Sequence, residues 1–107
     1  MISLIYGSVH AQNLDSLYGV WQDDTKSDSI RVYAYTGYVW LGYVAQNPGR
    51  AVILADSLHR FAKKHAYPRA SAYGYHIQGV AHYYMGKYTK SLDYYKQTLA
   101  IYEELGD

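Results

Sequence analysis

Cysteine is absent from this chain of 107 residues. Disulfide bonds, thiolate metal sites and cysteine nucleophiles are therefore excluded. Net charge is nearly absent too, because ten basic and nine acidic side chains leave a formal charge of +1. Proteins that bind nucleic acid or anionic membranes carry a basic patch or excess, so we expect neither partner. No stretch is long and apolar enough to span a bilayer, and none alternates polar and apolar residues as a strand does.

Phenylalanine occurs once, whereas tyrosine occurs fifteen times. Tyrosine has a large apolar ring with a polar tip. It suits thin helical layers whose ring edges stay near water, and it also suits a partner-binding surface. Hydrophobic residues make up 50% of the chain, which argues against disorder. The length is that of one domain.

Residues 1–11 are apolar and rich in small side chains, and Val9-His10-Ala11 has the small-x-small pattern of a secretory cleavage site. No Lys or Arg precedes the apolar run. Two interpretations are open. Residues 1–11 are either a truncated signal peptide, which predicts an exported, periplasmic or extracytoplasmic protein, or the ordinary N-terminus of a cytoplasmic one.

Helix signals predict about five helices and an all-α fold. In the segment 12–26, Asn13 is expected to cap a short helix, and residues 23–26 form a polar connector. The apolar face of this short helix has helical spacing. It consists of Leu14, Leu17, Tyr18 and Trp21.

The next two helices form a first hairpin, residues 27–67. Ser27 or Asp28 can cap its first helix, which is expected to run to about Ala45. The apolar face of that helix includes Ile30, Tyr35, Tyr38, Val39 and Leu41. Asn47-Pro48 then caps a second helix, since proline is tolerated in a first turn. This second helix runs to about Lys64, with Ala51, Leu54, Ala55, Leu58, Phe61 and Ala62 along one side.

Residues 68–107 form a second hairpin. After Tyr67-Pro68, a helix is expected from about Arg69 to Met85, and Gly86 fits a left-handed stop. The last helix runs from about Tyr88 to Leu105 and ends at Gly106. The residues expected to pack inward from it are Ser91, Leu92, Tyr95, Thr98, Leu99 and Tyr102.

The two hairpins are similar to each other. Tyr33, Tyr35 and Tyr43 recur forty residues later as Tyr73, Tyr75 and Tyr83. Size and polarity classes agree over most of both segments, as two copies of one helix-turn-helix unit require.

The segment from Val80 to Leu99 resembles a tetratricopeptide repeat (TPR), and the resemblance covers roughly residues 73–107. The small, glycine and aromatic positions of the family fall on Gly79, Gly86, Tyr88, Ser91, Tyr95 and Thr98. Gly79 and Ser91 are expected to let two helices approach closely, while Tyr95 and Leu99 fill the groove between units. Gln78 and His82 depart from the pattern, because the family usually has a large apolar residue and an aromatic there.

The first hairpin looks like a more divergent copy. Ala51 and Ala55 keep the small positions and Leu58 follows them, but Asn47-Pro48 replaces the glycine turn. The resemblance implies TPR-like hairpins stacked as a short right-handed α-solenoid. The forty-residue spacing and the ending from Leu99 to Asp107 are similar to arrays found outside the membrane in bacterial sensor proteins. Those arrays often precede a histidine kinase, a nucleotide cyclase or a DNA-binding output.

Stacked units of this family line a concave surface with their first helices, which implies a protein or peptide partner. The matching residues are Tyr33, Thr36, Trp40, Tyr43, Tyr73, His76, Val80 and Tyr83. A rigid aromatic groove suits an extended peptide or an apolar helix. The alternative is that these side chains simply pack against neighbouring helices. The Lys, Arg and Asn clamp by which some members hold a carboxylate is not matched.

Catalytic chemistry is not indicated. The five histidines lack metal-ligand spacing, no nucleophile turn occurs, and no glycine-rich loop follows a strand, so we expect no enzyme activity, cofactor or metal. Lys63, Lys64 and His65, with Arg60 and Arg69, form a small basic cluster that is either a solvated helix end or a nucleic-acid patch.

Two functions remain. The first is an interaction module, the N-terminal sensory or scaffold part of a longer bacterial signalling protein. The second is a structural module that forms a homo-oligomer through its last helix, because a stacked array without a polar capping helix leaves an apolar flank.

Overall fold

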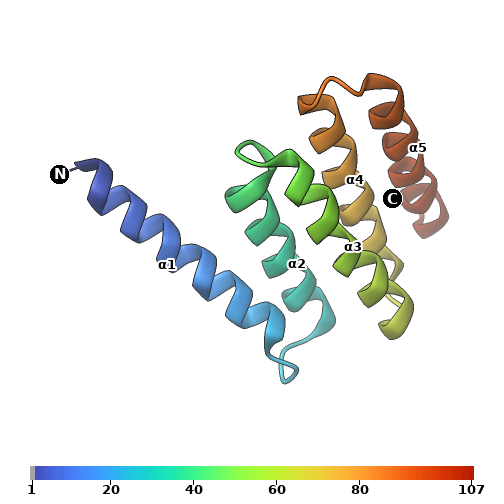
Figure 1. Cartoon of the computed structure of the whole chain (residues 1–107). Coiled ribbons are helices and arrows are strands. Elements are labelled where there is room, and N and C mark those ends of the chain that lie inside the picture. The colour runs from blue at the N-terminus through green and yellow to red at the C-terminus, as the bar shows by residue number, and fades with distance from the viewer. Residues whose placement is uncertain (1) are drawn as a thin grey trace.

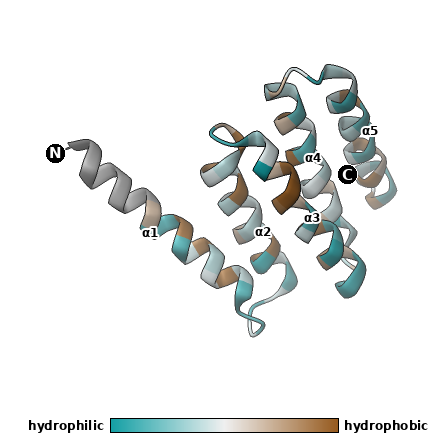
Figure 2. Cartoon of the chain, viewed as in Figure 1, coloured by the Kyte–Doolittle hydropathy of each residue, from teal (hydrophilic) through white to brown (hydrophobic). Residues whose placement is uncertain are grey.

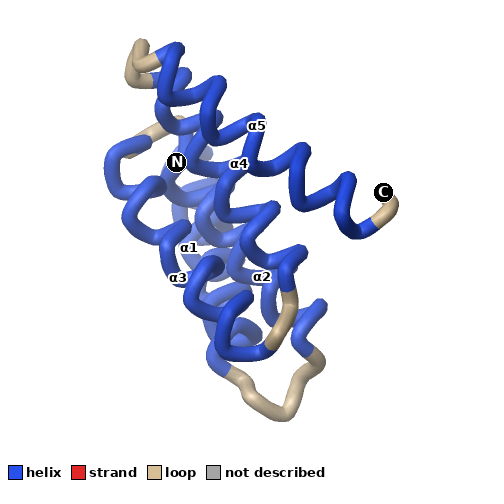
Figure 3. The backbone as a smooth tube through the Cα atoms, turned by 90° about the vertical axis from the view of Figure 1, so that its right-hand side faces the viewer, coloured by secondary structure: helices blue, strands red, loops and turns tan. Residues whose placement is uncertain are grey.

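The computed structural model describes the backbone of residues 2–107 and the side chains of residues 11–107. The elements are α1 (Ile2–Gln22), α2 (Asp28–Val39), the π-helical turn η1 (Trp40–Val44), α3 (Pro48–His65), α4 (Pro68–Tyr84) and α5 (Tyr88–Leu105). Each helix packs against the next, and short turns reverse the chain between them (Figures 1 and 3). The expected all-α stack of about five helices is confirmed, with no strand among residues 2–107.

Capping side chains, first-turn prolines and a left-handed glycine mark most of the helix ends. The Ser27 hydroxyl accepts a hydrogen bond from the amide three residues on (3.4 Å), and the Asn47 side chain does the same (3.2 Å). Both caps were predicted. Pro48 and Pro68 occupy the first positions of α3 and α4, where a missing N–H costs nothing. Gly86 has a φ of 75°, as its predicted left-handed stop requires.

The start of α1 was predicted wrongly. The helix begins at Ile2, so Asn13 lies inside it and caps nothing. Asparagine inside a helix lowers helix stability by less than 1 kcal/mol relative to alanine. That is too little to end a helix when the residues on both sides favour the helical conformation. The signal-peptide prediction for residues 1–11 concerns side chains that are described only at residue 11, and it stays a prediction.

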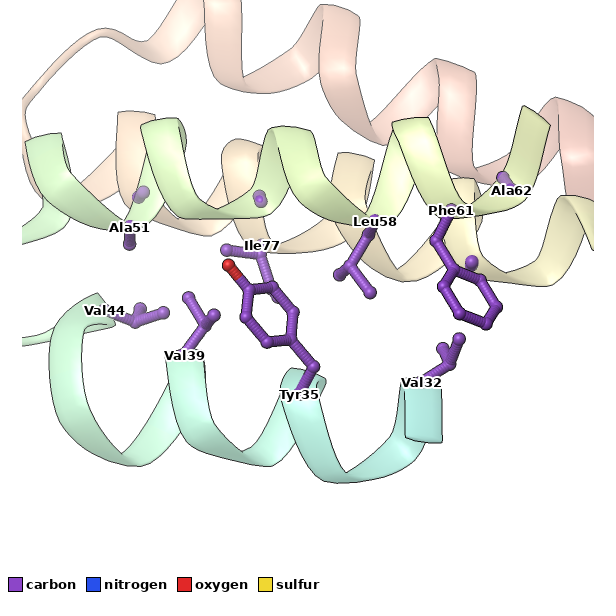
Figure 4. Packing of buried hydrophobic residues seen from close by; sticks show 12 residues of the cluster. Val32, Tyr35, Val39, Val44, Ala51, Leu58, Phe61, Ala62 and Ile77 are labelled. Carbon is purple, nitrogen blue, oxygen red and sulfur yellow. The ribbon is translucent and has the colours of Figure 1, made fainter. Parts of the chain in front are cut away.

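The hydrophobic core lies between α2, α3 and α4 (Figure 4). Val32, Tyr35 and Val39 face Leu58 and Phe61 across it, and all five are buried. The Tyr35 hydroxyl donates to the backbone carbonyl of α3 at Leu54 (2.8 Å), so its polar tip is satisfied inside the core. Burying a side chain such as Leu58 contributes about 2 kcal/mol.

The π-helical turn keeps two valines in this core. In an α-helix, residues five apart point about 140° away from each other. Val39 and Val44 are five apart, yet they are 0% and 2% exposed. The wider turn of η1, which follows Val39, brings both to the same side. Hydrophobic spacing alone did not predict this turn.

The second hairpin closes as predicted through small residues. The Ser91 hydroxyl donates to the Gly79 carbonyl (2.7 Å), so α4 and α5 touch at these positions. A Cβ atom built on Gly79 lies only 2.8 Å from Cε1 of Tyr95, so a side chain there has no room. Ala51, Ala55 and Leu58, the small and apolar positions of the first hairpin, are fully buried.

Gln78, one of the two departures from the repeat pattern, joins α3 to α4 by hydrogen bonds. Its Nε2 donates to the Val52 carbonyl (3.1 Å) and to Asp56 Oδ1 (2.9 Å). Its Oε1 therefore accepts from His59 Nε2 (2.9 Å), whose other ring nitrogen faces Ser71 Oγ (3.0 Å). A buried amide with every partner present fixes the register of two helices, whereas an unpaired one costs about 1–3 kcal/mol.

α1 packs against α2, and its described part alternates between apolar and polar segments (Figure 2). Leu14 and Leu17 lie against Gly42 and Gly37, where Cβ atoms would come within 3.2 and 3.7 Å of the leucine methyl groups. The Trp21 ring stacks on Tyr35 with centroids 4.3 Å apart. The face predicted for the short N-terminal helix therefore does make the contacts of α1, although α1 is longer than predicted.

Four apolar residues predicted to face inward are more than half exposed. They are Ile30, Leu41, Leu92 and Leu99. Helical spacing tells which residues share a face, but not whether another element covers that face. In the described chain no helix packs against the outer side of α5, so its leucines stay open.

Candidate functional site

A hollow of about 370 Å³ runs along α4 and α5. His76, Tyr95, Thr98, Leu99 and Tyr102 line it, and we call it the aromatic groove. Thr98 is buried, and its hydroxyl donates to the Tyr94 carbonyl one turn back (3.1 Å). Because this hydroxyl is already used, the groove presents mainly apolar and aromatic surface.

A row of three rings crosses three elements beside this groove. The Trp40 ring of η1 meets His76 of α4 edge to face, with centroids 5.5 Å apart. His76 in turn lies 6.2 Å from Tyr95 of α5. Partial burial against these rings lowers the pKa of His76, so its imidazole is neutral at pH 7. A neutral imidazole offers one donor and one acceptor.

One end of the groove is held by an ion pair. The Arg69 guanidinium pairs with the Asp107 carboxylate. Its central carbon lies 5.9 Å from the centre of the Tyr102 ring, in the range of a cation–π contact. Burial raises the pKa of the Tyr102 phenol. These contacts fix the ring that forms the end wall.

Five of the eight residues predicted for the concave face belong to this row or pack against the core. Trp40 and His76 belong to the row itself, while Tyr43, Tyr73 and Val80 pack against the core cluster. Several of these side chains therefore pack against neighbouring helices, and of the eight only His76 lines the aromatic groove.

The other three lie elsewhere. Tyr33 is 76% exposed and borders a separate hollow of about 440 Å³ between α1 and α2. Thr36 donates to the Val32 carbonyl (2.8 Å). Tyr43, within η1, also shares a hydroxyl–hydroxyl hydrogen bond with Tyr38 (3.1 Å). Tyr83 is exposed, with its ring 5.3 Å from Tyr88, which is itself exposed.

Sequence reasoning missed the α5 wall of the groove. Tyr95, Leu99 and Tyr102 were expected to pack inward, yet they line an open hollow with His76. They stand at i, i+4 and i+7, so one helical face was visible in the sequence. The sequence does not show that this face of α5 lies beside α4 and is left open to solvent.

A metal site and a membrane span would each need a feature that the described residues lack. Among them, no three His, Asp or Glu side chains gather closely enough to hold a metal ion. None of the helices they form is apolar over the length needed to cross a bilayer. Every buried side-chain nitrogen or oxygen that the structure describes has a hydrogen-bond partner.

Comparison of the chain with protein-family models, with curated proteins and with solved structures gives no match. No relative therefore supplies a function for the aromatic groove.

Proposed function

We propose that this chain is a TPR-like interaction module that binds a protein or peptide segment in the aromatic groove. The observation that carries the proposal is the row of Trp40, His76 and Tyr95, which crosses three elements and borders an apolar hollow of about 370 Å³. Leu99 is 59% exposed at this hollow, so apolar surface is available to a partner.

The chemistry of the groove favours a polypeptide. Aromatic side chains supply contact area at low entropic cost, because only two torsions are fixed. The neutral imidazole of His76 can hydrogen-bond a peptide N–H or C=O without a charge penalty. An extended peptide or an apolar helix with one or two large side chains matches this combination.

The TPR-like part of the proposal rests on packing as well as on resemblance. The contact of Gly79 with Ser91 and Tyr95, together with the left-handed Gly86, agrees with the role those positions have in the repeat. The placement in an exported sensory region of a longer bacterial signalling protein rests on the sequence alone, through the signal-like pattern of residues 1–11 and the family resemblance.

Self-association is the second candidate, and the exposed leucines of α5 favour it. Leu92 and Leu99 stand two turns apart and are 53% and 59% exposed. A second copy of the chain could cover both, because exposed apolar patches commonly mark interfaces.

Three matched substitutions separate the two candidates. Leu99→Asp changes the groove and the exposed face of α5, and Leu92→Asp changes only that face. Ile53→Asp is the control, because Ile53 of α3 is 58% exposed and borders none of the hollows described here. Peptides are first selected from a displayed library for binding to the unsubstituted chain. Their affinity for each variant is then measured by calorimetry, and the mass of each variant in solution is measured by analytical ultracentrifugation.

We expect Leu99→Asp to weaken peptide binding about 30-fold, the effect of losing an anchor worth about 2 kcal/mol. Leu92→Asp and Ile53→Asp should leave it unchanged. If Leu99→Asp and Ile53→Asp bind selected peptides equally well, the groove is not the binding site. If the mass depends on concentration and both leucine variants abolish that dependence, self-association is favoured.

A further inference from the structure

A second hollow, of about 250 Å³, lies where the end of α1, the start of α2 and the last turns of α3 meet. Four basic side chains, a serine and two aromatic rings surround it. They are Trp21, Arg31, Ser57, Arg60, Phe61, Lys64 and His65. None of them belongs to the aromatic groove. We call this hollow the cationic pocket.

Helical spacing and one long-range contact build the cationic pocket. Its five α3 residues, from Ser57 to His65, stand at i, i+3, i+4, i+7 and i+8, so they share one face. Arg31 joins them from α2, which the sequence did not reveal. Its Nε donates to the Trp21 carbonyl (2.9 Å), and its guanidinium carbon lies 5.2 Å from the Phe61 ring centre.

These contacts hold Arg31 in place before any ligand arrives. One of its five donors is used by the Trp21 carbonyl, and its planar face lies near two aromatic rings. The N–H groups of the two outer guanidinium nitrogens therefore stay available to donate to a ligand. Arg60 is also positioned, because its Nη2 donates to Ser57 Oγ (3.0 Å).

Three of the positive charges here have no carboxylate paired directly with them among the described residues, although Asp23 lies near enough to Arg31 for their charges to interact. Only His65 has a carboxylate within 4.0 Å, that of Asp28 at 3.3 Å. Arg31, Arg60 and Lys64 form no ion pair among the described residues. Like charges at one site repel each other, so an anion bound between them is favoured.

A role in stabilising the end of α3 does not account for this arrangement. Lys64 and His65 are in the last turn, where cations suit the helix dipole. Arg60 precedes the last turn, and Arg31 belongs to another helix. A nucleic-acid patch does not fit either, because a single small pocket on a chain of net charge +1 can neutralise one phosphate but not a row of them.

We propose that the cationic pocket binds one phosphate group. Two guanidinium forks and an ammonium match a dianion with three or four acceptor oxygens better than they match a carboxylate, which one arginine can satisfy. The phosphate is either free or carried on a Ser or Thr side chain of a peptide. Both sources present the same dianionic oxygens near pH 7.

Tryptophan fluorescence can test this directly. The chain has two tryptophans, and Trp21 lines the cationic pocket while Trp40 does not. In a Trp40→Phe variant, Trp21 is the sole reporter. We expect a saturable change in its emission when sodium phosphate is added at pH 7.5, with ionic strength held constant by sodium chloride.

Arg60→Gln should weaken phosphate binding about tenfold or more, the effect of losing a charge-assisted hydrogen bond. Arg50→Gln is the matched control, because Arg50 is an exposed arginine on the same helix outside the cationic pocket, and it should change nothing. Circular dichroism verifies that both variants are folded. Leu99→Asp should leave the phosphate titration unchanged, so failure here and failure of the groove proposal are distinguishable.

The proposal is overturned if phosphate gives no saturable change, or if acetate at equal ionic strength gives the same one. Equal weakening by Arg60→Gln and Arg50→Gln, or no weakening by Arg60→Gln, also overturns it. A phosphoserine tetrapeptide and its unphosphorylated form identify the source. Tighter binding of the phosphopeptide than of inorganic phosphate indicates a phosphorylated partner, and equal or weaker binding indicates free phosphate.

Discussion

Replacing Gly79 by alanine should destabilise this protein, although alanine is the better helix former. Inside a helix the exchange alone favours alanine by about 1 kcal/mol. At this position, however, the added Cβ lies 2.8 and 2.9 Å from two ring atoms of Tyr95 and 3.4 Å from the Ser91 carbonyl. Overpacking of this kind costs about 1–3 kcal/mol. The expected net loss is therefore about 1 kcal/mol.

Urea denaturation followed by circular dichroism measures this loss. With a slope of about 2 kcal/mol per molar urea, the midpoint should fall by about 0.5 M. Tyr95→Leu removes the ring that the new methyl group meets. In that background Gly79→Ala should raise stability by up to about 1 kcal/mol, because only the propensity gain remains.

Gly19→Ala is the control, since Gly19 lies in α1 and a Cβ built there meets nothing within 4 Å. It should be neutral or stabilising. The reasoning is refuted if Gly79→Ala changes the urea midpoint in the same direction as Gly19→Ala. An equal penalty with and without the Tyr95 ring also refutes it.

Three further predictions concern single contacts. Gly86→Ala should lower the free energy of unfolding by about 1 kcal/mol, because φ is 75° there and a Cβ atom disfavours the left-handed conformation. Gly86→Asn should cost less, since asparagine tolerates this conformation, and equal losses in urea denaturation contradict the prediction. Tyr35→Phe should cost about 1 kcal/mol, because it removes the hydroxyl hydrogen bond that joins α2 to the Leu54 carbonyl of α3, and an unchanged thermal midpoint contradicts this. The hydrogen bond with Tyr43, and burial, raise the pKa of Tyr38 to about 12, so Tyr43→Phe should lower it in an ultraviolet phenolate titration. Since this pKa is raised above its ordinary value of 10.0, the contribution of Tyr38 to stability is complete below pH 10 and is lost as the pH rises towards 12.

Much of the fold could be predicted because its signals are local. Ser27 and Asn47 cap the helices that follow them, and Gly86 adopts its left-handed turn, since each effect depends on atoms within four residues. The contact of Gly79 with Ser91 was also predictable, because the turn between them is short and both residues are small.

The rest depends on which element covers which face. Asn13 looked like a helix start, but nothing local prevents the helix from passing through it. Leu99 looked like a core residue, and only the position of α5 at the edge of the stack leaves it exposed. Arg31 joins a basic cluster thirty residues away because α2 and α3 lie side by side. No window of sequence contains that information.

α4 has a glycine on each of its two packed sides. A Cβ built on Gly74 would lie 2.9 Å from the His59 ring of α3, as the one on Gly79 would from Tyr95 of α5. At both positions the backbone of α4, and no side chain of α4, therefore lies directly against the flanking helix. Because α3 and α5 cover α4 this closely, the amides in the middle of α4 should be among the slowest in the chain to exchange their hydrogens with solvent.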